Sequence, residues 1–355
     1  MPYGTLALDQ ITPSTNLKIV GGVQLNDNSV ISTFNSMGMR NRIINGSMDI
    51  DQRNAGSSQT ITAGAALAYT VDRWYAYCTG ANVTAQRVDN TGTAGSPSLY
   101  AYQFTGAASV TGIGFGQRIE AVNCYDLAGS TATLSVSLAN SLLTTVTWTA
   151  YYANTIDTFG TLASPTRTQI ATGTFTVNSQ LTRYNAQITV PSAATTGIEI
   201  VFSVAAQTSG TWTIDNVQFE PGSVATPFER KMITHETNLC YRYYYRWSSN
   251  GATYAHLAVC RAYSTTNGTC NIFLPSPMRK YPPTLSTSTV SASTWDYSLT
   301  AINPSGTGVI PGGPGNLISS YSVNVTGSLG GAGTCFVLGS QNSTTPIFLA
   351  LDAEL

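Results

Sequence analysis

The sequence has 355 residues, and Asp, Glu, Lys and Arg together make up only 9% of them, against about 25% in typical soluble domains. With 16 basic and 17 acidic residues the formal net charge is −1, which leaves too little positive charge to bind DNA through many phosphate contacts. The same balance excludes coiled coils, which need charged flanks, and disorder driven by a large net charge.

Ser, Thr, Asn and Gly fill the polar positions, while 42% of the residues are hydrophobic and the mean hydropathy is +0.02. Such a surface suits strands that pack closely in an assembly, because buried unpaired charge is costly. No apolar run approaches the ~18 residues that span a bilayer, and the start lacks the basic and apolar regions of a signal peptide. We expect no membrane insertion, no nucleic-acid partner, and a protein that stays where it is made or leaves by lysis.

Residues 1–40 contain short apolar pieces at Leu6–Leu8, Leu17–Val20 and Val23–Leu25, separated by turn-forming residues. These pieces can pair as strands, but they are too few to form a core of their own. We interpret 1–40 as an anchoring arm that completes its fold on a partner.

Residues 41–230 alternate apolar and polar side chains with the period of two that is typical of β-strands. Clear examples lie at 134–138, 146–150 and 198–204. The alternation shifts by one residue at Asp215-Asn216, which predicts a β-bulge. Many short strands separated by turn formers predict an all-β fold, with a jelly-roll β-sandwich as the central domain.

Residues 231–247 form a linker with a short helix. Thr234 is placed to cap this helix, and the apolar spacing predicts that it ends near residue 241. The three tyrosines at 243–245 favour a strand directly after it.

Residues 248–355 return to β patterning, as at 257–259, 272–274 and 347–351. This part predicts a second, smaller C-terminal β-sandwich. The Gly- and Pro-rich stretch Pro304–Gly315 predicts a long loop of the kind that contacts a partner.

Six cysteines are spread along the chain without the paired spacing of zinc sites or redox motifs. Because no export signal is visible, we expect buried free thiols. A cross-strand bridge between Cys260 and Cys270 remains an alternative. Neither His235 nor His256 lies in a metal-ligand pattern.

The sequence lacks a nucleophile elbow, a zinc-protease motif and a P-loop. The glycines of 112–116 superficially resemble a nucleotide loop, but their spacing favours a bulged strand. Glycosidases need two carboxylates at a suitable separation. Most of the acidic residues here have sequence neighbours that can pair with them, which favours a structural role. The acids in question are Asp49, Asp51, Asp72, Glu120, Asp215 and Glu220. We expect no enzymatic activity and no catalytic residues.

Basic residues cluster at the start of the main domain, beside acids that can neutralise them. We expect an ion-pair network that pins the first strands, formed by Arg42, Arg53, Arg73, Asp49, Asp51 and Asp72. A second ion pair is expected between Arg118 and Glu120.

Aromatic residues in or beside the predicted strands are the best candidates for ligand contacts. A sugar ring stacks its apolar face on an exposed aromatic ring, while neighbouring polar groups bind its hydroxyls. Core packing is the alternative for each of these residues. The candidate carbohydrate-binding residues are Trp74, Tyr77, Trp148, Tyr151 and Trp212.

Several segments resemble a family of bacteriophage virion proteins, mainly tail fibres and related appendages. In the main domain they are Asn41–Asn54, Tyr69–Trp74, Gln117–Glu120 and Gln218–Glu229. Cys240–Tyr244 and Phe273–Arg279 extend the likeness, which covers residues 40–285. The central domain of that family is similar to the jelly roll of carbohydrate-binding modules.

The resemblance implies a homotrimer that joins other virion proteins through its arm and is located in the virion after assembly in the host cytoplasm. In related sugar-binding sandwiches a structural Ca²⁺ often bridges the first and last strands. The matching positions are near Asn45, Asp49 and Asp215, whose oxygen atoms suit a hard cation. No other cofactor is expected.

Three functions remain as hypotheses. The first is a trimeric tail fibre or receptor-binding appendage that binds host-surface glycan. The alternative is a capsid decoration protein or head fibre, which the absence of an extended shaft favours slightly. A polysaccharide depolymerase is the third, and it requires an acidic cleft that this chain barely supplies.

Overall fold

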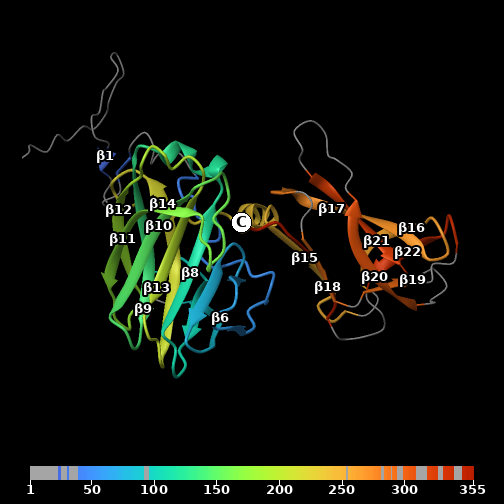
Figure 1. Cartoon of the computed structure of the whole chain (residues 1–355), viewed down its shortest axis with the longest axis horizontal. Helices are drawn as coiled ribbons and strands as arrows, with labels where there is room; N and C mark the ends of the chain where they lie inside the picture. The colour runs from blue at the N-terminus through green and yellow to red at the C-terminus, as the bar shows by residue number, and fades with distance from the viewer. Residues whose placement is uncertain are drawn as a thin grey trace, which may run out of the picture.

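The computed structural model describes residues 23–24, 30–31, 39–91, 96–252, 255–280, 284–288, 290–293, 299–308, 318–326, 331–339 and 346–355. Figure 1 shows two β-rich units with a short helix between them. Of the predicted arm, the described part is residues 39–40 and the paired strands β1 (Val23–Gln24) and β2 (Val30–Ile31). The other predictions for the arm lie outside the described residues.

The larger unit is a sandwich of two six-stranded sheets, which confirms the predicted all-β, jelly-roll-like fold. The first sheet has the order β11 (Arg167–Thr176), β10 (Thr145–Ala153), β13 (Ile198–Val204), β8 (Gly112–Ile119), β5 (Tyr75–Thr79) and β4 (Ala68–Tyr69). The second sheet has the order β12 (Thr182–Thr189), β9 (Thr131–Asn140), β14 (Thr211–Pro221), β7 (Tyr100–Thr105), β6 (Val83–Asp89) and β3 (Gln59–Ile61).

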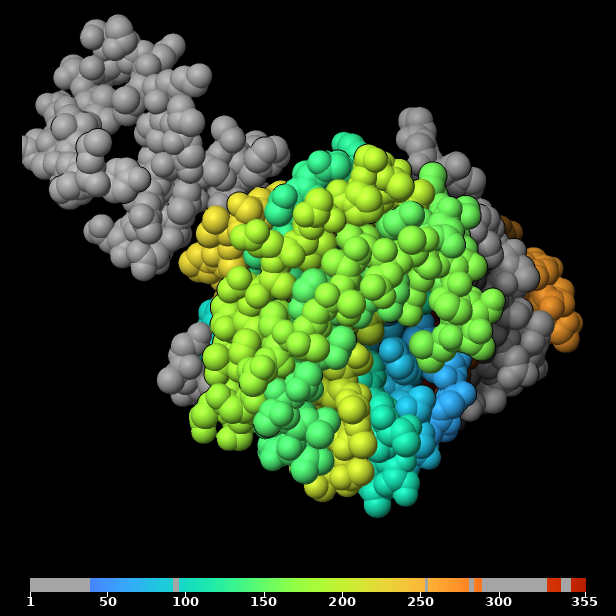
Figure 2. Space-filling view, turned by 60° about the vertical axis from the view of Figure 1, so that its left-hand side comes forward, coloured from blue at the N-terminus to red at the C-terminus, as the bar shows by residue number. Residues whose placement is uncertain are grey.

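Short 3-10 helices, η1 (Ala121–Asn123) and η2 (Tyr125–Leu127), connect β8 to β9. Figure 2 turns the left side of Figure 1 forward, toward the edge at which β11 and β12 lie. The green to yellow-green part of the chain, which includes these strands, covers most of the visible surface there.

The apolar side chains of both sheets meet in one core. Leu134, Val136 and Leu138 of β9 are fully buried, as their alternation predicts. The rings of Trp74 and Phe115 stack at the centre, with 4.7 Å between their centroids. Removing such large apolar surfaces from water is the main favourable term that holds the two sheets together.

The predicted bulge in β14 is confirmed. Its register against β9 shifts between Asp215 and Gln218, and Asn216 between them has a φ of +51°. Asparagine adopts this left-handed backbone conformation more readily than most residues. The prediction of a bulged strand at 112–116 is wrong, because β8 keeps a continuous register with both β5 and β13.

The linker forms helix α1 (Ile233–Tyr241), which ends where the sequence predicts. Its N-cap is Met232, which makes no side-chain cap bond, so the predicted cap at Thr234 is wrong by two residues. The tyrosines lead into β15 (Tyr244–Ser248), as predicted. Among the described residues no helix is long and apolar enough to cross a membrane.

The C-terminal unit is a closed barrel with a small sheet beside it, which corrects the predicted second sandwich. The barrel order is β16 (His256–Ala262), β17 (Asn267–Met278), β21 (Ile318–Thr326), β20 (Leu299–Gly308), β19 (Val290–Ser293) and β22 (Cys335–Gly339). The sheet has the order β15, β23 (Phe348–Asp352) and β18 (Thr284–Thr287). Part of the predicted loop, 304–308, belongs to β20, and 309–317 lie outside the described residues.

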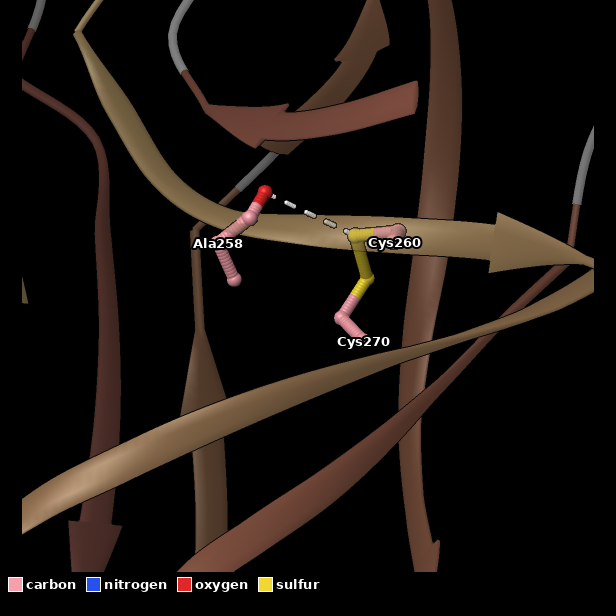
Figure 3. Close-up of a disulfide and its surroundings, with 3 residues drawn as sticks. All are labelled: Ala258, Cys260 and Cys270. Carbon is pink, nitrogen blue, oxygen red and sulfur yellow. Dashed lines mark hydrogen bonds between the residues drawn. A yellow bond between two sulfur atoms is a disulfide. The ribbon is translucent and has the colours of Figure 1, made fainter. Parts of the chain in front are cut away.

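A disulfide joins Cys260 of β16 to Cys270 of β17 (Figure 3). The two residues are direct cross-strand partners with their Cα atoms 4.1 Å apart. The expectation of free thiols is therefore wrong for this pair, since the register brings their side chains together. The other four cysteines are free, and Cys335 is the exposed one among them.

The end of the chain packs against the sandwich through buried arginines. Arg73 is 1% exposed, forms an ion pair with Glu354, and donates to the carbonyl oxygen of Arg118 at 2.6 Å. Its guanidinium carbon lies 3.4 Å from the ring centroid of Tyr243. Arg73 also has a φ of +74°, a conformation that costs energy for arginine and persists only when the surrounding contacts hold it.

Other arginines bind the same C-terminal segment. Arg53 forms ion pairs with Asp352 at 3.0 Å and Glu354 at 3.3 Å. Arg279 donates to the backbone oxygens of Ala353 and Glu354 at 2.7 and 2.8 Å. The segment is therefore held by charged hydrogen bonds from both units, which are stronger than neutral ones.

Two further arginines complete this contact. Arg118 donates to the backbone oxygen of Leu355 at 2.7 Å and pairs with Glu199 of β13 at the same distance. Arg242, just after α1, pairs with Glu120 at 2.9 Å. We call this contact the arginine joint; its members are Arg53, Arg73, Arg118, Arg242, Arg279, Glu120, Asp352 and Glu354.

The ion pairs differ from the predicted ones. Two of the three clustered arginines pair with the C-terminal acids, and Arg42 pairs with Asp126 at 2.6 Å. The predicted pair of Arg118 with Glu120 is also wrong, because each has another partner. The fold supplies these partners from as far as 301 positions away in the sequence, beyond the reach of local patterning.

The joint makes a prediction about stability. Arg73→Met leaves Glu354 buried with one fewer positive partner, so we expect the free energy of unfolding to fall by about 3 kcal/mol. The measurement is urea denaturation, with Arg261→Met at an exposed position of β16 as the control that changes little. Adding Glu354→Gln should recover part of the loss, and strictly additive effects of the two substitutions would contradict a direct pair.

Candidate functional site

Three of the five predicted ligand residues are core residues. Trp74, Trp148 and Trp212 are 0%, 6% and 0% exposed, and all pack in the main hydrophobic cluster. Trp148 and Trp212 share the inward phase of their strands, and Trp74 Nε1 donates to the carbonyl oxygen of Asn45 at 2.9 Å. These rings cannot stack on a sugar, so the prediction is wrong for them.

The other two predicted residues lie on the outer face of the first sheet. Tyr77 is half-buried and directly opposite Gly114 of β8. A Cβ atom at Gly114 would lie 2.1 Å from Tyr77 Cζ, so the tyrosine ring lies across the glycine. The same row continues across the sheet with Ser203 of β13 and Thr147 of β10. Glycine is needed here because any other side chain would displace the ring.

Tyr151 lies on the same face, in a second row. It is half-buried, and Arg167 of β11 has its guanidinium carbon 4.0 Å from the Tyr151 ring centroid. Glu199 is the cross-strand partner of Tyr151 and forms an ion pair with Arg167. A cation held over an aromatic ring is attracted by the π electrons, which fixes both side chains.

Glu199 is the centre of the polar contacts on this face. It is fully buried and accepts hydrogen bonds from Tyr75 Oη at 2.7 Å and from Arg118 Nε at 2.7 Å, besides the Arg167 pair. Burial, together with the Glu199 charge, raises the pKa of Tyr75 well above its usual value. Glu199 is thus fully engaged and positions the groups around it.

The two predicted tyrosines and the charged pair lie close together. Burial raises the pKa of Tyr77, and the charges of Arg167, Tyr151 and Glu199 all act on it. We call this surface the tyrosine face; its members are Tyr75, Tyr77, Tyr151, Arg167 and Glu199. Between the tyrosines, β8 and β13 present Gly114, Gly116, Val201 and Ser203 on this face, and the rings of Tyr77 and Tyr75 lie across the two glycines.

Sequence reasoning missed part of this face. The alternation of Ile198, Ile200 and Phe202 places Glu199 on the outer side, so its position was available from the pattern. The position of Arg167 could not be predicted from the alternation, because it depends on a register shift in the β10–β11 pair after Ala150.

Asn45, one of the three residues proposed for calcium, is not free to bind a cation. It is fully buried, and its side chain is used by backbone groups: Oδ1 accepts from the Ile50 nitrogen, and Nδ2 donates to the backbone oxygens of Ile50 and Asp72. The described residues contain no group of three or more His, Cys, Asp or Glu side chains that could hold a metal ion. Asp49 accepts from Ser47 Oγ at 2.8 Å, and its buried Oδ1 has no hydrogen-bond partner in the described structure, so calcium at Asp49 and Asp215 stays a prediction.

Asp215 is satisfied by neutral donors instead. Its carboxylate accepts from Asn90 Nδ2 and Ser96 Oγ at 2.9 Å each, and from the backbone and side-chain nitrogens of Asn216 at 2.6 and 2.8 Å. Burial raises the pKa of Asp215 to about 7. The charge of Asp49 acts in the same direction.

The carboxylates considered for glycoside hydrolysis have structural partners. Glu120 binds Arg242 and the Tyr243 hydroxyl, the latter at 2.7 Å. Glu220 accepts from the Thr226 hydroxyl at 2.6 Å and lies 3.4 Å from Arg40 Nε. Asp72 accepts from the backbone and side chain of Gln52, and burial raises its pKa to about 6.

No protein-family model and no curated protein matches the chain. Among solved structures, the chain is similar to the enzymatically active domain of bacteriophage CBA120 tailspike protein 4, with 16% identity, a TM-score of 0.33, and coverage of 52% of this chain and 22% of that one. TmCBM61 in complex with β-1,4-galactotriose is similar with 14% identity and a TM-score of 0.32, over 52% of this chain and 99% of that one. A CBM4 structure is similar with 18% identity and a TM-score of 0.31, over 50% of this chain and 98% of that one. Similarity this low assigns neither a family nor a function.

The raised carboxyl pKa values predict how stability depends on pH. An unfolded aspartate releases its proton near 3.8, whereas Asp72 and Asp215 hold theirs to about 6 and about 7 in the folded chain. The folded state therefore binds more protons between these limits, and stability falls as pH rises from about 4 to about 7. We expect the melting temperature to fall over this range in a pH series of thermal denaturation.

Variants separate this effect from others. Asp215→Asn should flatten the fall, whatever its absolute melting temperature. Asp89→Asn is the control, and we expect it not to flatten the fall in melting temperature. Hydrogen bonds from Thr91 lower the pKa of exposed Asp89, so its own contribution to stability rises with pH. A melting temperature that rises steadily from pH 4 to 7 in the unaltered chain would contradict the assignment.

Proposed function

We propose that this chain is a non-catalytic bacteriophage virion protein, a trimeric tail fibre or related appendage, that binds host-surface glycan through the tyrosine face. The observation that carries the proposal is the pair of half-buried rings, Tyr77 and Tyr151, on one outer sheet face beside Arg167. Aromatic rings that are fixed in place bind the apolar face of a sugar at little cost in side-chain entropy.

The remaining groups on this face suit the hydroxyls of a sugar. The Ser203 and Thr147 side chains lie in the row of Tyr77, and both are hydroxyls on the outer side. Arg167 has further guanidinium hydrogens beyond its pair with Glu199, and a guanidinium donates readily to hydroxyl oxygens. Glu199 acts as a positioning residue, because its bonds hold Arg167 and Tyr75 in place.

The virion part of the proposal has separate support. It rests on the resemblance of Asn41–Asn54 and Gln218–Glu229 to phage appendage proteins and on the low charge of the chain. The homotrimer and the attachment through residues 1–40 belong to the same proposal. The absence of catalysis is supported by Glu120 and Glu220, whose carboxylates are held by structural partners.

The glycan prediction concerns affinity. Tyr77→Ala and Tyr151→Ala each remove one stacking ring, so we expect each to weaken glycan binding by about tenfold, or about 1.4 kcal/mol. A glycan array identifies the sugar, and calorimetry on the full chain gives the dissociation constants. Tyr125→Ala, an exposed tyrosine of η2 outside this face, is the matched control and should bind as the unaltered chain does.

The outcome also separates the alternatives. Unchanged affinity in both tyrosine variants, or no glycan bound at all, would contradict the proposal. Absent glycan binding together with full occupancy of the capsid in labelled virions would favour the decoration protein. New reducing ends after incubation with host polysaccharide would favour a depolymerase.

A further inference from the structure

An open groove with polar and apolar lining lies on the opposite side of the sandwich, on the outer face of the second sheet. It has a volume of about 650 Å³ and is open to solvent. Arg183 of β12 and Ser137 of β9 are cross-strand partners on its floor, and the bulge at Asn216 of β14 forms one side. Pro227 and Phe228 form the wall. None of these residues belongs to the tyrosine face.

Every hydrogen bond that Arg183 makes goes to a neutral oxygen, as with Arg279 and unlike Arg53, Arg73, Arg118 and Arg242, which pair with carboxylates. The Arg183 guanidinium donates to Asn216 O at 3.1 Å, Ser135 Oγ at 2.6 Å and Thr226 O at 3.4 Å. Within the described part of the chain, Arg183 forms no ion pair. Burial lowers the Arg183 pKa, the direction expected of a desolvated cation.

The charges of Glu220 and Asp215 act on Arg183, but neither carboxylate comes within ion-pair distance, so the guanidinium has no direct ionic partner among the described residues. A guanidinium has five N–H donors in a planar fork, and its three bonds to protein oxygens leave donors free. The free donors, on Nε and Nη1, can each donate to a carboxylate oxygen, and a partly desolvated bond of this kind is stronger than one in water. The groove is therefore built to receive a carboxylate.

The walls indicate what carries the carboxylate. Phe228 is half-buried and, with Pro227, gives an apolar surface on which a sugar ring can pack. Ser137 supplies a hydroxyl at the other side, while the hydroxyl of Ser96 is used within the protein by Asp215 and Asn216. The volume lies within the range of about 300–1,000 Å³ that is typical of small-ligand sites.

We propose that the Arg183 groove binds an acidic sugar residue, with the carboxylate on Arg183 and the ring against Phe228. The site is independent of the tyrosine face and recognises a different part of a saccharide or a different saccharide. It therefore stands or falls separately from the proposed function above.

The first test compares ligands on the unaltered full-length chain. The probes are trigalacturonate, a glucuronate-containing tetrasaccharide and sialyllactose, each with its carboxyl-reduced counterpart, measured by calorimetry and ligand-observed NMR. We expect at least one acidic probe to bind at least tenfold more tightly than its reduced form, and its affinity to fall as salt rises. No binding by any acidic probe at millimolar concentration, or equal binding of acid and reduced forms, would overturn the proposal.

Variants then place the site. Arg183→Gln should abolish the preference for the acid, and Phe228→Ala should weaken both forms while keeping that preference. Arg261→Gln, at an exposed position of β16, is the matched control and should leave the affinity unchanged. Phe228→Ala keeps the test decisive if Arg183→Gln does not fold.

Two results would overturn the assignment at this stage. One is an acid preference that survives in folded Arg183→Gln, or an affinity that is unchanged in Phe228→Ala. The other is an acidic peptide, such as tetraglutamate, that binds the groove more tightly than every acidic sugar probe.

Discussion

Buried arginines hold the two β units of this chain together. Arg73 and Arg53 of the sandwich bind Glu354, while Arg279 from the other unit binds the backbone of the same segment. Such charges are costly to bury alone and become stable only when each is paired and hydrogen-bonded. The few charges in the chain are concentrated in contacts of this kind. The charge deficit of the sequence therefore leaves most of the outer strands to uncharged polar groups.

The same contact reaches the proposed glycan surface. Arg118 donates to Leu355 at the end of the chain and pairs with Glu199, which in turn holds Arg167 over Tyr151. The order of the tyrosine face thus depends on the joint through one continuous set of bonds. On the opposite sheet, Arg183 lines an open groove and bonds only to neutral oxygens, whereas Arg53, Arg73 and Arg242 of the joint pair with carboxylates.

The local alternation of apolar and polar residues predicted many of the strands, but few of the contacts between residues that are distant in the sequence. The alternation through 134–138 predicted buried strand residues, and the phase shift at Asp215 predicted the bulge, because both depend only on neighbours in sequence. The same alternation places Trp148 inside, although aromatic character alone had made it a ligand candidate. The ion pair of Arg73 with Glu354 depends on how the end of the chain packs on the sandwich, and the disulfide of Cys260 with Cys270 depends on strand register. Neither can be read from a local sequence pattern.

A crystal structure of the chain with its tightest-binding oligosaccharide is the decisive measurement for sugar binding at the tyrosine face. We expect a sugar ring packed on Tyr77 or Tyr151, with a hydroxyl bonded to Arg167. A neutral oligosaccharide bound elsewhere on the chain, with both tyrosine rings left bare, would contradict it.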